Sequence, residues 1–233
     1  MTRPTLVANT VTRLLRSGRR IQETKISSGK MAVPGRRNGL MDDEEDEGLF
    51  EEDGIMDDLE SDTPPHLRDL AAAVELGDID ALRNALDNLN GSIDEPVEDG
   101  DTALHLTCLY GHLPCVQLLL ERGANLEARD EDGGIPLHDA CAGGFAEIVQ
   151  HLITRANSPE RVTRMLESVD AEGDTPLHHA ARGEHVGVIR LLLAAGSSPT
   201  RANISGKIPS ELADPDSEAR RVLEAAAGAM PSQ

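Results

Sequence analysis

The feature that most constrains this chain is an eight-residue pattern that recurs along it. The sequence DTALHLTC begins at Asp101, GIPLHDAC begins at Gly134, and DTPLHHAA begins at Asp174. Each copy leads into a second apolar segment, at residues 116–120, 148–153 and 188–193. A recurrence at this spacing predicts a solenoid of helix pairs, in which each unit buries its apolar face against its neighbours.

Two weaker copies flank the three clear ones. Residues 70–82 fit the same template when they are aligned with residues 104–116, and residues 206–213 fit it after the last clear copy, with Glu211 in place of the histidine. Five units with degenerate outer copies are typical of a solenoid whose end repeats act as caps. The residue types agree with this, because a threonine and a proline start the first helix, and Gly123 and Gly196 end the second.

These blocks resemble the ankyrin repeat, whose pattern is a Thr-Pro-Leu-His turn followed by paired helices. The resemblance covers about residues 66–229 and implies an all-α ankyrin-repeat solenoid, with helix-turn-helix units, finger loops, about three full repeats and two degenerate caps. Three positions depart from the pattern: Ala103 replaces the proline, Ile135 replaces the threonine, and Glu184 replaces the glycine between the helices. These departures concern local geometry and not the fold.

The composition divides the chain into three parts. Residues 1–40 form a basic tail, residues 41–65 an acidic arm, and residues 66–230 the repeat domain. The acidic arm is predicted to be disordered, because its like charges repel one another. Within the domain the expected repeats span about 66–97, 98–130, 131–170, 171–203 and 204–230.

The basic tail has more than one interpretation. Residues 1–39 carry nine basic residues and a single acidic one, Glu23, which is the composition of an organellar transit peptide. The alternatives are a disordered basic tail, or an upstream extension of a chain that usually starts at Met31 or Met41. The expected location is the cytoplasm, the nucleus or both, with the mitochondrion or plastid as the alternative if residues 1–30 act as a transit peptide.

The acidic arm also has two interpretations. Residues 41–62 contain thirteen acidic residues and neither lysine nor arginine. Apolar residues are spaced among these acids: Leu49, Phe50, Ile55, Met56 and Leu59. Such alternation can dock on a basic, apolar groove, and a solubilising tail with incidental apolar residues is an equal alternative.

The charge balance restricts the partners. The chain has 22 lysine and arginine residues against 42 aspartates and glutamates, a formal net charge of -20. This disfavours nucleic acids and anionic membranes, whose phosphates would be repelled, and favours a basic protein. No apolar run approaches the roughly 20 residues that span a bilayer. The three cysteines are too few for a disulfide framework and indicate a reducing compartment.

No motif in the sequence predicts catalysis. A glycine-rich phosphate loop, a Gly-x-Ser-x-Gly turn and an evident carboxylate pair are all missing. His105, His138 and His178 fall at equivalent positions, about 10 Å apart in stacked helices, so they cannot surround one zinc ion. The ankyrin resemblance implies instead that they are hydrogen-bonding struts, with Thr102 and Thr175 in the same structural motif. We expect no enzymatic activity, no cofactor and no metal.

The resemblance places the partner-binding residues on the finger tips and on the concave helix face. Leu109 and Tyr110 are expected to form an exposed apolar anchor on that face, and Arg182 holds the matching position in a later unit. The finger-tip positions are mostly acidic: Glu98, Asp99, Asp101, Glu131, Asp132, Ala171, Glu172 and Asp174. Together these residues predict a monomeric adaptor or scaffold for a basic protein segment. The alternatives are an escort chaperone for a basic client and a regulatory subunit in an organelle.

The unit over residues 131–170 carries an insertion that the other units lack. Ser158, Pro159 and Glu160 form a good helix start, so residues 158–168 are expected to form an additional or extended helix. Three arginines make this the one basic spot on the acidic domain: Arg155, Arg161 and Arg164. The spot is either a secondary contact site or only a solubilised face.

Overall fold

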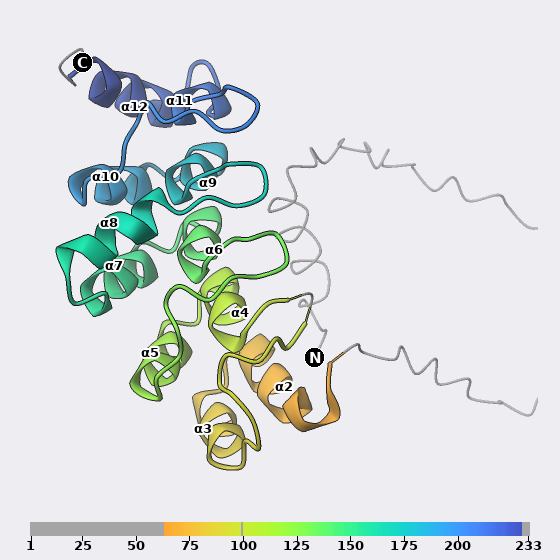
Figure 1. Ribbon diagram of the computed structural model, residues 1–233. Helices are drawn as coiled ribbons and strands as arrows, with labels where there is room; N and C mark the ends of the chain where they lie inside the picture. Colours follow the sequence, from red (N-terminus) through yellow and green to blue (C-terminus); the bar gives the residue numbers. More distant parts are fainter. Residues whose placement is uncertain (1–62, 99, 230–233) are drawn as a thin grey trace, which may run out of the picture. The chain divides into compact units, whose positions relative to one another are not determined.

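The computed structural model describes residues 63–98 and 100–229, and this part of the chain is helical (Figure 1). Within these ranges there is no β-strand, and Glu98 and Asp101 form an isolated antiparallel bridge. No helix of the described part is long and apolar enough to cross a membrane. The all-α prediction is confirmed for these residues. The predictions for the basic tail and for residues 41–62 lie outside the described part.

Five helix pairs follow a short 3-10 helix, η1 (Pro65–Leu67). The pairs are α2 (Arg68–Leu76) with α3 (Ile79–Asp87), α4 (Ala103–Tyr110) with α5 (Leu113–Glu121), α6 (Pro136–Ala142) with α7 (Ala146–Arg155), α9 (Pro176–Arg182) with α10 (Val186–Ala194), and α11 (Pro209–Leu212) with α12 (Glu218–Gly228). One further helix, α8 (Pro159–Glu167), lies between the third and fourth pairs.

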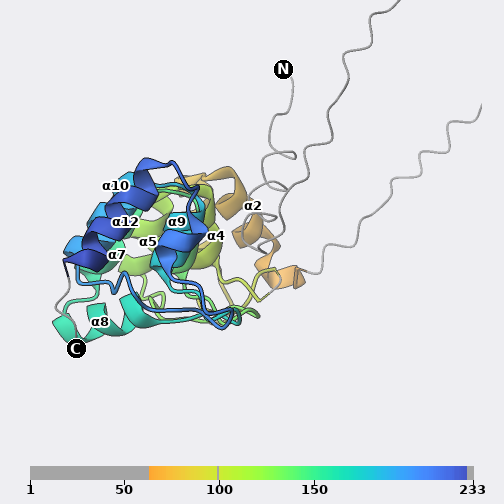
Figure 2. The same cartoon turned by 90° about the horizontal axis from the view of Figure 1, so that it is seen from above.

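The pairs stack in the order in which the chain makes them. The first helices pack in one row, α2 on α4, α4 on α6, α6 on α9 and α9 on α11, and the second helices pack in another row from α3 to α12. Figure 1 shows both rows. Figure 2 shows that the loops between units gather on one side of the stack, the side on which α8 also lies.

The histidine of the pattern fixes the start of the first helix in a unit. The backbone N–H of the residue before the helix donates to a side chain one helical turn later, at 2.9–3.2 Å. The pairs are Thr102 to His105, Ile135 to His138, Thr175 to His178 and Ile208 to Glu211. Because this bond uses only the backbone of the first residue, it does not need a threonine. Ile135 therefore keeps the extended backbone of Thr102 and Thr175.

Glu184 shows what a side chain costs at the turn between two helices. Its φ is 58°, in the left-handed region that Gly111 and Gly144 adopt at the equivalent turns with φ of 80° and 76°. A residue with a Cβ is strained there by roughly 1–2 kcal/mol. The Glu184 carboxylate accepts a hydrogen bond from the backbone N–H of Asp214 at 2.6 Å, which offsets part of this strain.

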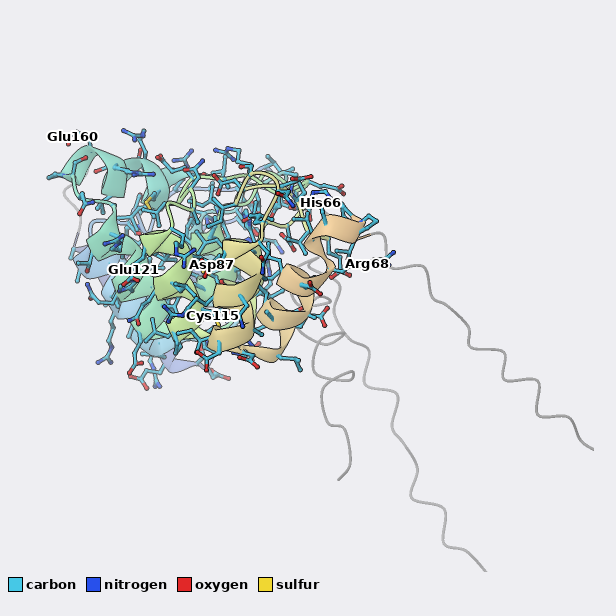
Figure 3. All side chains as sticks on the ribbon, turned by 90° about the horizontal axis from the view of Figure 1, so that it is seen from below. His66, Arg68, Asp87, Cys115, Glu121 and Glu160 are labelled. Carbon is cyan, nitrogen blue, oxygen red and sulfur yellow. The ribbon has the colours of Figure 1, made fainter. Side chains whose placement is uncertain are left out.

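The core is a continuous apolar layer within the stack. Its fully buried side chains include Leu104, Leu119, Leu137, Ile148, Leu152, Leu177 and Ile189. Every residue of α4 from Ala103 to Leu109 is buried, because α2 packs on one side of this helix and α6 on the other. Cys108, Cys115 and Cys141 are free thiols within the layer, and Figure 3 labels Cys115.

The insertion in the third unit folds as α8. Ser158 caps the helix by accepting a hydrogen bond from the backbone N–H of Arg161 at 3.2 Å, and Pro159 occupies the first turn, where no N–H is needed. Met165 and Leu166 anchor α8 on the stack and are buried, whereas Glu160 is exposed on its first turn (Figure 3). The expectation of an additional helix at this place is confirmed.

Candidate protein-binding surface

Two of the recurrent histidines, His138 and His178, join neighbouring units. Because Nδ1 of each ring accepts a backbone N–H, the neutral ring carries its proton on Nε2. Nε2 of His138 donates to the backbone oxygen of Asp174 at 3.3 Å, and Nε2 of His178 donates to that of Lys207 at 3.2 Å. Burial lowers the pKa of both rings, and for His138, with His179 nearby, the pKa falls to about 3. Both rings are therefore neutral struts at physiological pH.

The finger tips of successive units are linked through the backbone. The N–H of Ala171 donates to the oxygen of Asp132 at 2.7 Å, and the N–H of Ile204 donates to the oxygen of Glu172 at 3.1 Å. Glu131, Asp132 and Glu172 are exposed along this row. Three of the acidic residues expected at the tips are therefore exposed on neighbouring fingers.

Two other acids expected at the tips point into the protein. Asp101 is 6% exposed and Asp174 is 1% exposed, so the expectation that they project into solvent is wrong. Asp174 forms an ion pair with Arg182 and accepts a hydrogen bond from Nδ2 of Asn203 at 2.7 Å. Arg182 of α9 and Asn203 of the next finger thus provide polar partners for this buried carboxylate. Arg182, expected on the binding face, is thereby engaged within the protein.

Two groups of side chains bring possible cation ligands together in the described part. In each group the ligand atoms lie within 4.8 Å of one another: Asp101, His105, Asp130 and Asp139 in the first, and Asp170, Asp174 and His179 in the second. In the second group His179 contacts Asp170 at 2.7 Å and Arg182 pairs with Asp174. The spacing between the recurrent histidines did not predict that Asp130 and Asp139 would lie beside His105.

The apolar anchor on the helix face differs from the one expected. Leu109 is only 6% exposed, so the expectation that it faces solvent is wrong, and Tyr110 is half-buried against the core. Leu76 is exposed instead, at 72%. It holds the position in the first unit that Tyr110 holds in the second, under the alignment of residues 70–82 with residues 104–116. That alignment was the sequence signal that could have identified it.

His112 connects the first two units at this face. Its Nε2 lies 3.3 Å from the backbone oxygen of Glu75, the residue before Leu76. Its ring centroid is 6.2 Å from that of Tyr110. The ends of α2 and α4, which carry Leu76 and Tyr110, therefore meet at His112. We call Glu75, Leu76, Tyr110 and His112 the Leu76–Tyr110 face.

Glu75 precedes Leu76, and its surroundings disfavour the ionised form of its carboxyl group. The pKa of Glu75 is raised by burial and, to a smaller degree, by the negative charge of Glu98. A cation placed beside Glu75 would stabilise its ionised form. Glu98 itself is half-buried. Asp99, which was also predicted to bind the partner, lies outside the described residues.

The same face carries smaller side chains in the later units. Ala142 and Gly143 occupy the equivalent positions in the third unit, and the ring of Phe145 lies directly against Gly143. Among the described residues, the most exposed large apolar side chains are Leu76 at 72% and Ile204 at 76%. An apolar contact on the helix face is therefore concentrated at its Leu76 end.

Comparison with known proteins leads to the same family as the repeat pattern. Residues 70–163 match a model of ankyrin repeats in three copies, and residues 172–204 match a model of the single ankyrin repeat. Over 36 residues, 16% of the chain, the sequence is 50% identical to a probable E3 ubiquitin-protein ligase, XBOS33, of Oryza sativa subsp. japonica. The matched stretch is only 7% of that relative's length. With more than half of its residues covered by these models, the chain belongs to the ankyrin repeat family.

Proposed function

We propose that this chain is an adaptor or scaffold that binds a basic segment of another protein. Ankyrin repeats generally mediate contacts between proteins, and domains built from them are generally non-enzymatic. The observation that supports the more specific proposal is exposed Leu76 beside Glu75, whose pKa burial and Glu98 raise. A partner segment with an apolar residue and a neighbouring lysine or arginine would cover Leu76 and stabilise the ionised form of Glu75.

The exposed finger tips would guide such a partner to the face. Their carboxylates act over a Debye length of about 8 Å at physiological ionic strength. Each exposed ion pair contributes only about 0.2–1 kcal/mol, so the tips serve mainly to speed association. The Leu76–Tyr110 face supplies the anchor. Affinity for the partner should therefore fall as salt rises, while the dependence on Leu76 persists.

Affinity capture from cell extract with the full chain tests the proposal. Leu76→Ser should reduce capture of a basic protein about tenfold, which corresponds to about 1.4 kcal/mol. Ile204→Ser is the matched control, because it removes an equally exposed apolar side chain from the last unit. Capture that depends on Ile204 and not on Leu76, or that yields only acidic proteins, would refute the proposal.

A second pair of variants tests the charge. Glu75→Gln removes the carboxylate beside Leu76, and it should weaken binding of the captured basic protein. Glu121→Gln removes an exposed carboxylate from the last residue of α5, which Figure 3 labels, at the opposite end of this helix from His112. Calorimetric titration of both variants should show a loss for Glu75 alone. Equal losses would mean that net charge, and not the face, sets the affinity.

A further inference from the structure

A pocket lies where α8 meets the loops of the neighbouring units. Its volume of about 440 Å³ falls in the roughly 300–1,000 Å³ range of ligand pockets. Ile135 and Met165, both buried, and half-buried Val169 form its apolar base. The exposed side chains around this base include three arginines: Arg129, Arg164 and Arg201. We call this the arginine pocket.

The backbone around the end of α8 holds two of these arginines in place. Arg129 donates to the oxygen of Val169 and to Oγ of Ser168, both at 3.0 Å. Arg201, from the next unit, donates to the oxygen of Glu167 at 3.0 Å. A guanidinium has five N–H groups, so these bonds position each group without using all of its donors. Binding an anion here costs little additional side-chain entropy, because the guanidinium groups are already fixed.

The carboxylate nearest to the third arginine is already neutralised. Arg164 donates to Oε1 of Glu127 at 3.2 Å, and Arg161 donates to Oε2 at 3.0 Å. Burial alone would raise the pKa of Glu127, but the two arginines outweigh burial and lower it. Glu127 therefore does not cancel the charge of the other two arginines. With Glu167 as the second acid in the lining, the arginine pocket remains positive.

Such a concentration of positive charge is unusual for this acidic domain. Residues 63–229 contain 13 lysines and arginines against 28 aspartates and glutamates, yet three of the 13 surround one pocket. Arg164 and Met165 belong to α8, the insertion that the other units lack. The arginine pocket is thus a feature of this particular chain and does not follow from the repeat pattern.

We propose that the arginine pocket binds an acidic segment of a second protein, separate from the basic partner of the Leu76–Tyr110 face. Carboxylates bind guanidinium groups through paired hydrogen bonds, so acidic residues on either side of an apolar one would contact Arg129 and Arg201, whose charges are not neutralised by Glu127. The apolar residue between them would cover Met165. This base favours a peptide over a free inorganic anion, which would leave the apolar surface in water. The proposal does not depend on the proposed function, because the two surfaces share no residue.

The test uses the full chain and a peptide of known acidic and apolar composition, LFEEDGIMDDLE, which is the sequence of residues 49–60. Calorimetry measures the affinity, and amide shifts of Ser168 and Val169 in NMR spectra report where the peptide binds. Arg201→Ala should weaken binding about tenfold, the loss expected for a hydrogen bond between charged groups. Arg190→Ala, which removes an exposed arginine of α10 outside the pocket, should leave binding unchanged.

Two controls separate the possible occupants. A peptide whose apolar residues are all serine keeps its charge and should bind about tenfold more weakly, since its apolar contact is lost, and inorganic phosphate should not displace the parent peptide. A second full chain carries serine at five positions: Leu49, Phe50, Ile55, Met56 and Leu59. Equal binding to both chains supports a partner's segment. Binding only to the serine chain would assign the pocket to residues 41–62 and overturn the proposal, as would no binding, shifts elsewhere or displacement by phosphate.

Discussion

Mild acid should destabilise this protein through its buried histidines, and His138 offers the clearest measurement. Its pKa is about 3 in the folded protein and about 6.5 in an unfolded chain. Between these values the unfolded chain binds a proton that the folded chain does not, so the free energy of unfolding falls as the pH falls. From pH 7.5 to pH 5.0 this one group should remove about 2 kcal/mol, at about 1.4 kcal/mol per pH unit below 6.5.

The groups that surround His138 support this choice of pH range. Asp170 has a pKa below its usual 3.8, because its hydrogen bond and charge interaction with His179 outweigh burial. It therefore loses its proton below the range and stays ionised within it. His178, whose pKa is also lowered by burial, adds a loss of the same sign. Glu75, whose pKa is raised, contributes with the opposite sign, so the effect of His138 is measured by comparison with a variant and not from the total slope.

Denaturant unfolding at pH 7.5, 6.5 and 5.0 measures the slope, with His138→Gln as the comparison. Glutamine cannot titrate in this range, and Glu211 of the last unit shows that a carboxyl-type oxygen can accept the same backbone N–H, at 2.9 Å. The variant should be less stable at pH 7.5, but its stability should decline about 2 kcal/mol less toward pH 5.0. Equal declines in both proteins would show that burial does not keep His138 neutral.

Three further predictions concern core packing, backbone conformation and a buried ion pair. Leu119→Ala should lower the free energy of unfolding by about 2–4 kcal/mol, because this fully buried side chain leaves a cavity between units; a loss near zero in denaturant unfolding would contradict the helix-face assignment. Gly187→Ala and Gly196→Ala form a matched pair, since an added Cβ meets no neighbouring atom within 4 Å at either site. Gly187 lies in α10, so alanine there should stabilise the protein by up to about 1 kcal/mol. Gly196 has φ 104°, so alanine there should destabilise the protein by about 1 kcal/mol or more. Shifts of the melting temperature with the same sign for both variants would contradict this. Arg182→Ala should cost about 1–3 kcal/mol by leaving the buried Asp174 carboxylate without its ion pair, and adding Asp174→Asn should restore part of the melting temperature.

The units and their helix starts could be predicted because they depend on residues that are close in sequence. The bond from Thr175 to His178 closes within one helical turn, and Ser158 and Pro159 start α8 through local chemistry alone. Such signals do not require knowledge of what packs against the helix. The departure at Ile135 had no effect on the fold for the same reason, since only its backbone takes part.

The binding surfaces could not be predicted in the same way. Periodicity identifies α4 as a helix, but Leu109 is buried because α2 and α6 pack on both sides of it, and those helices come from other units. Asp174 is buried because Asn203 reaches it from the next finger. The arginine pocket needs both Arg129 and Arg201, which belong to different units and lie far apart in the chain. Each of these facts depends on how the units register against one another.

The path of the chain around α8 has a consequence for engineering. Although α8 separates them in sequence, α6 packs directly on α9 and α7 packs directly on α10. The packing of the third helix pair on the fourth therefore does not depend on the length of the segment that connects Arg155 to Thr175. Lengthening such an excursion costs only about 0.6 kcal/mol per doubling. A grafted epitope or reporter peptide is therefore best placed at exposed Asn157, between α7 and α8, where it leaves the buried contacts of Met165 and Leu166 in place.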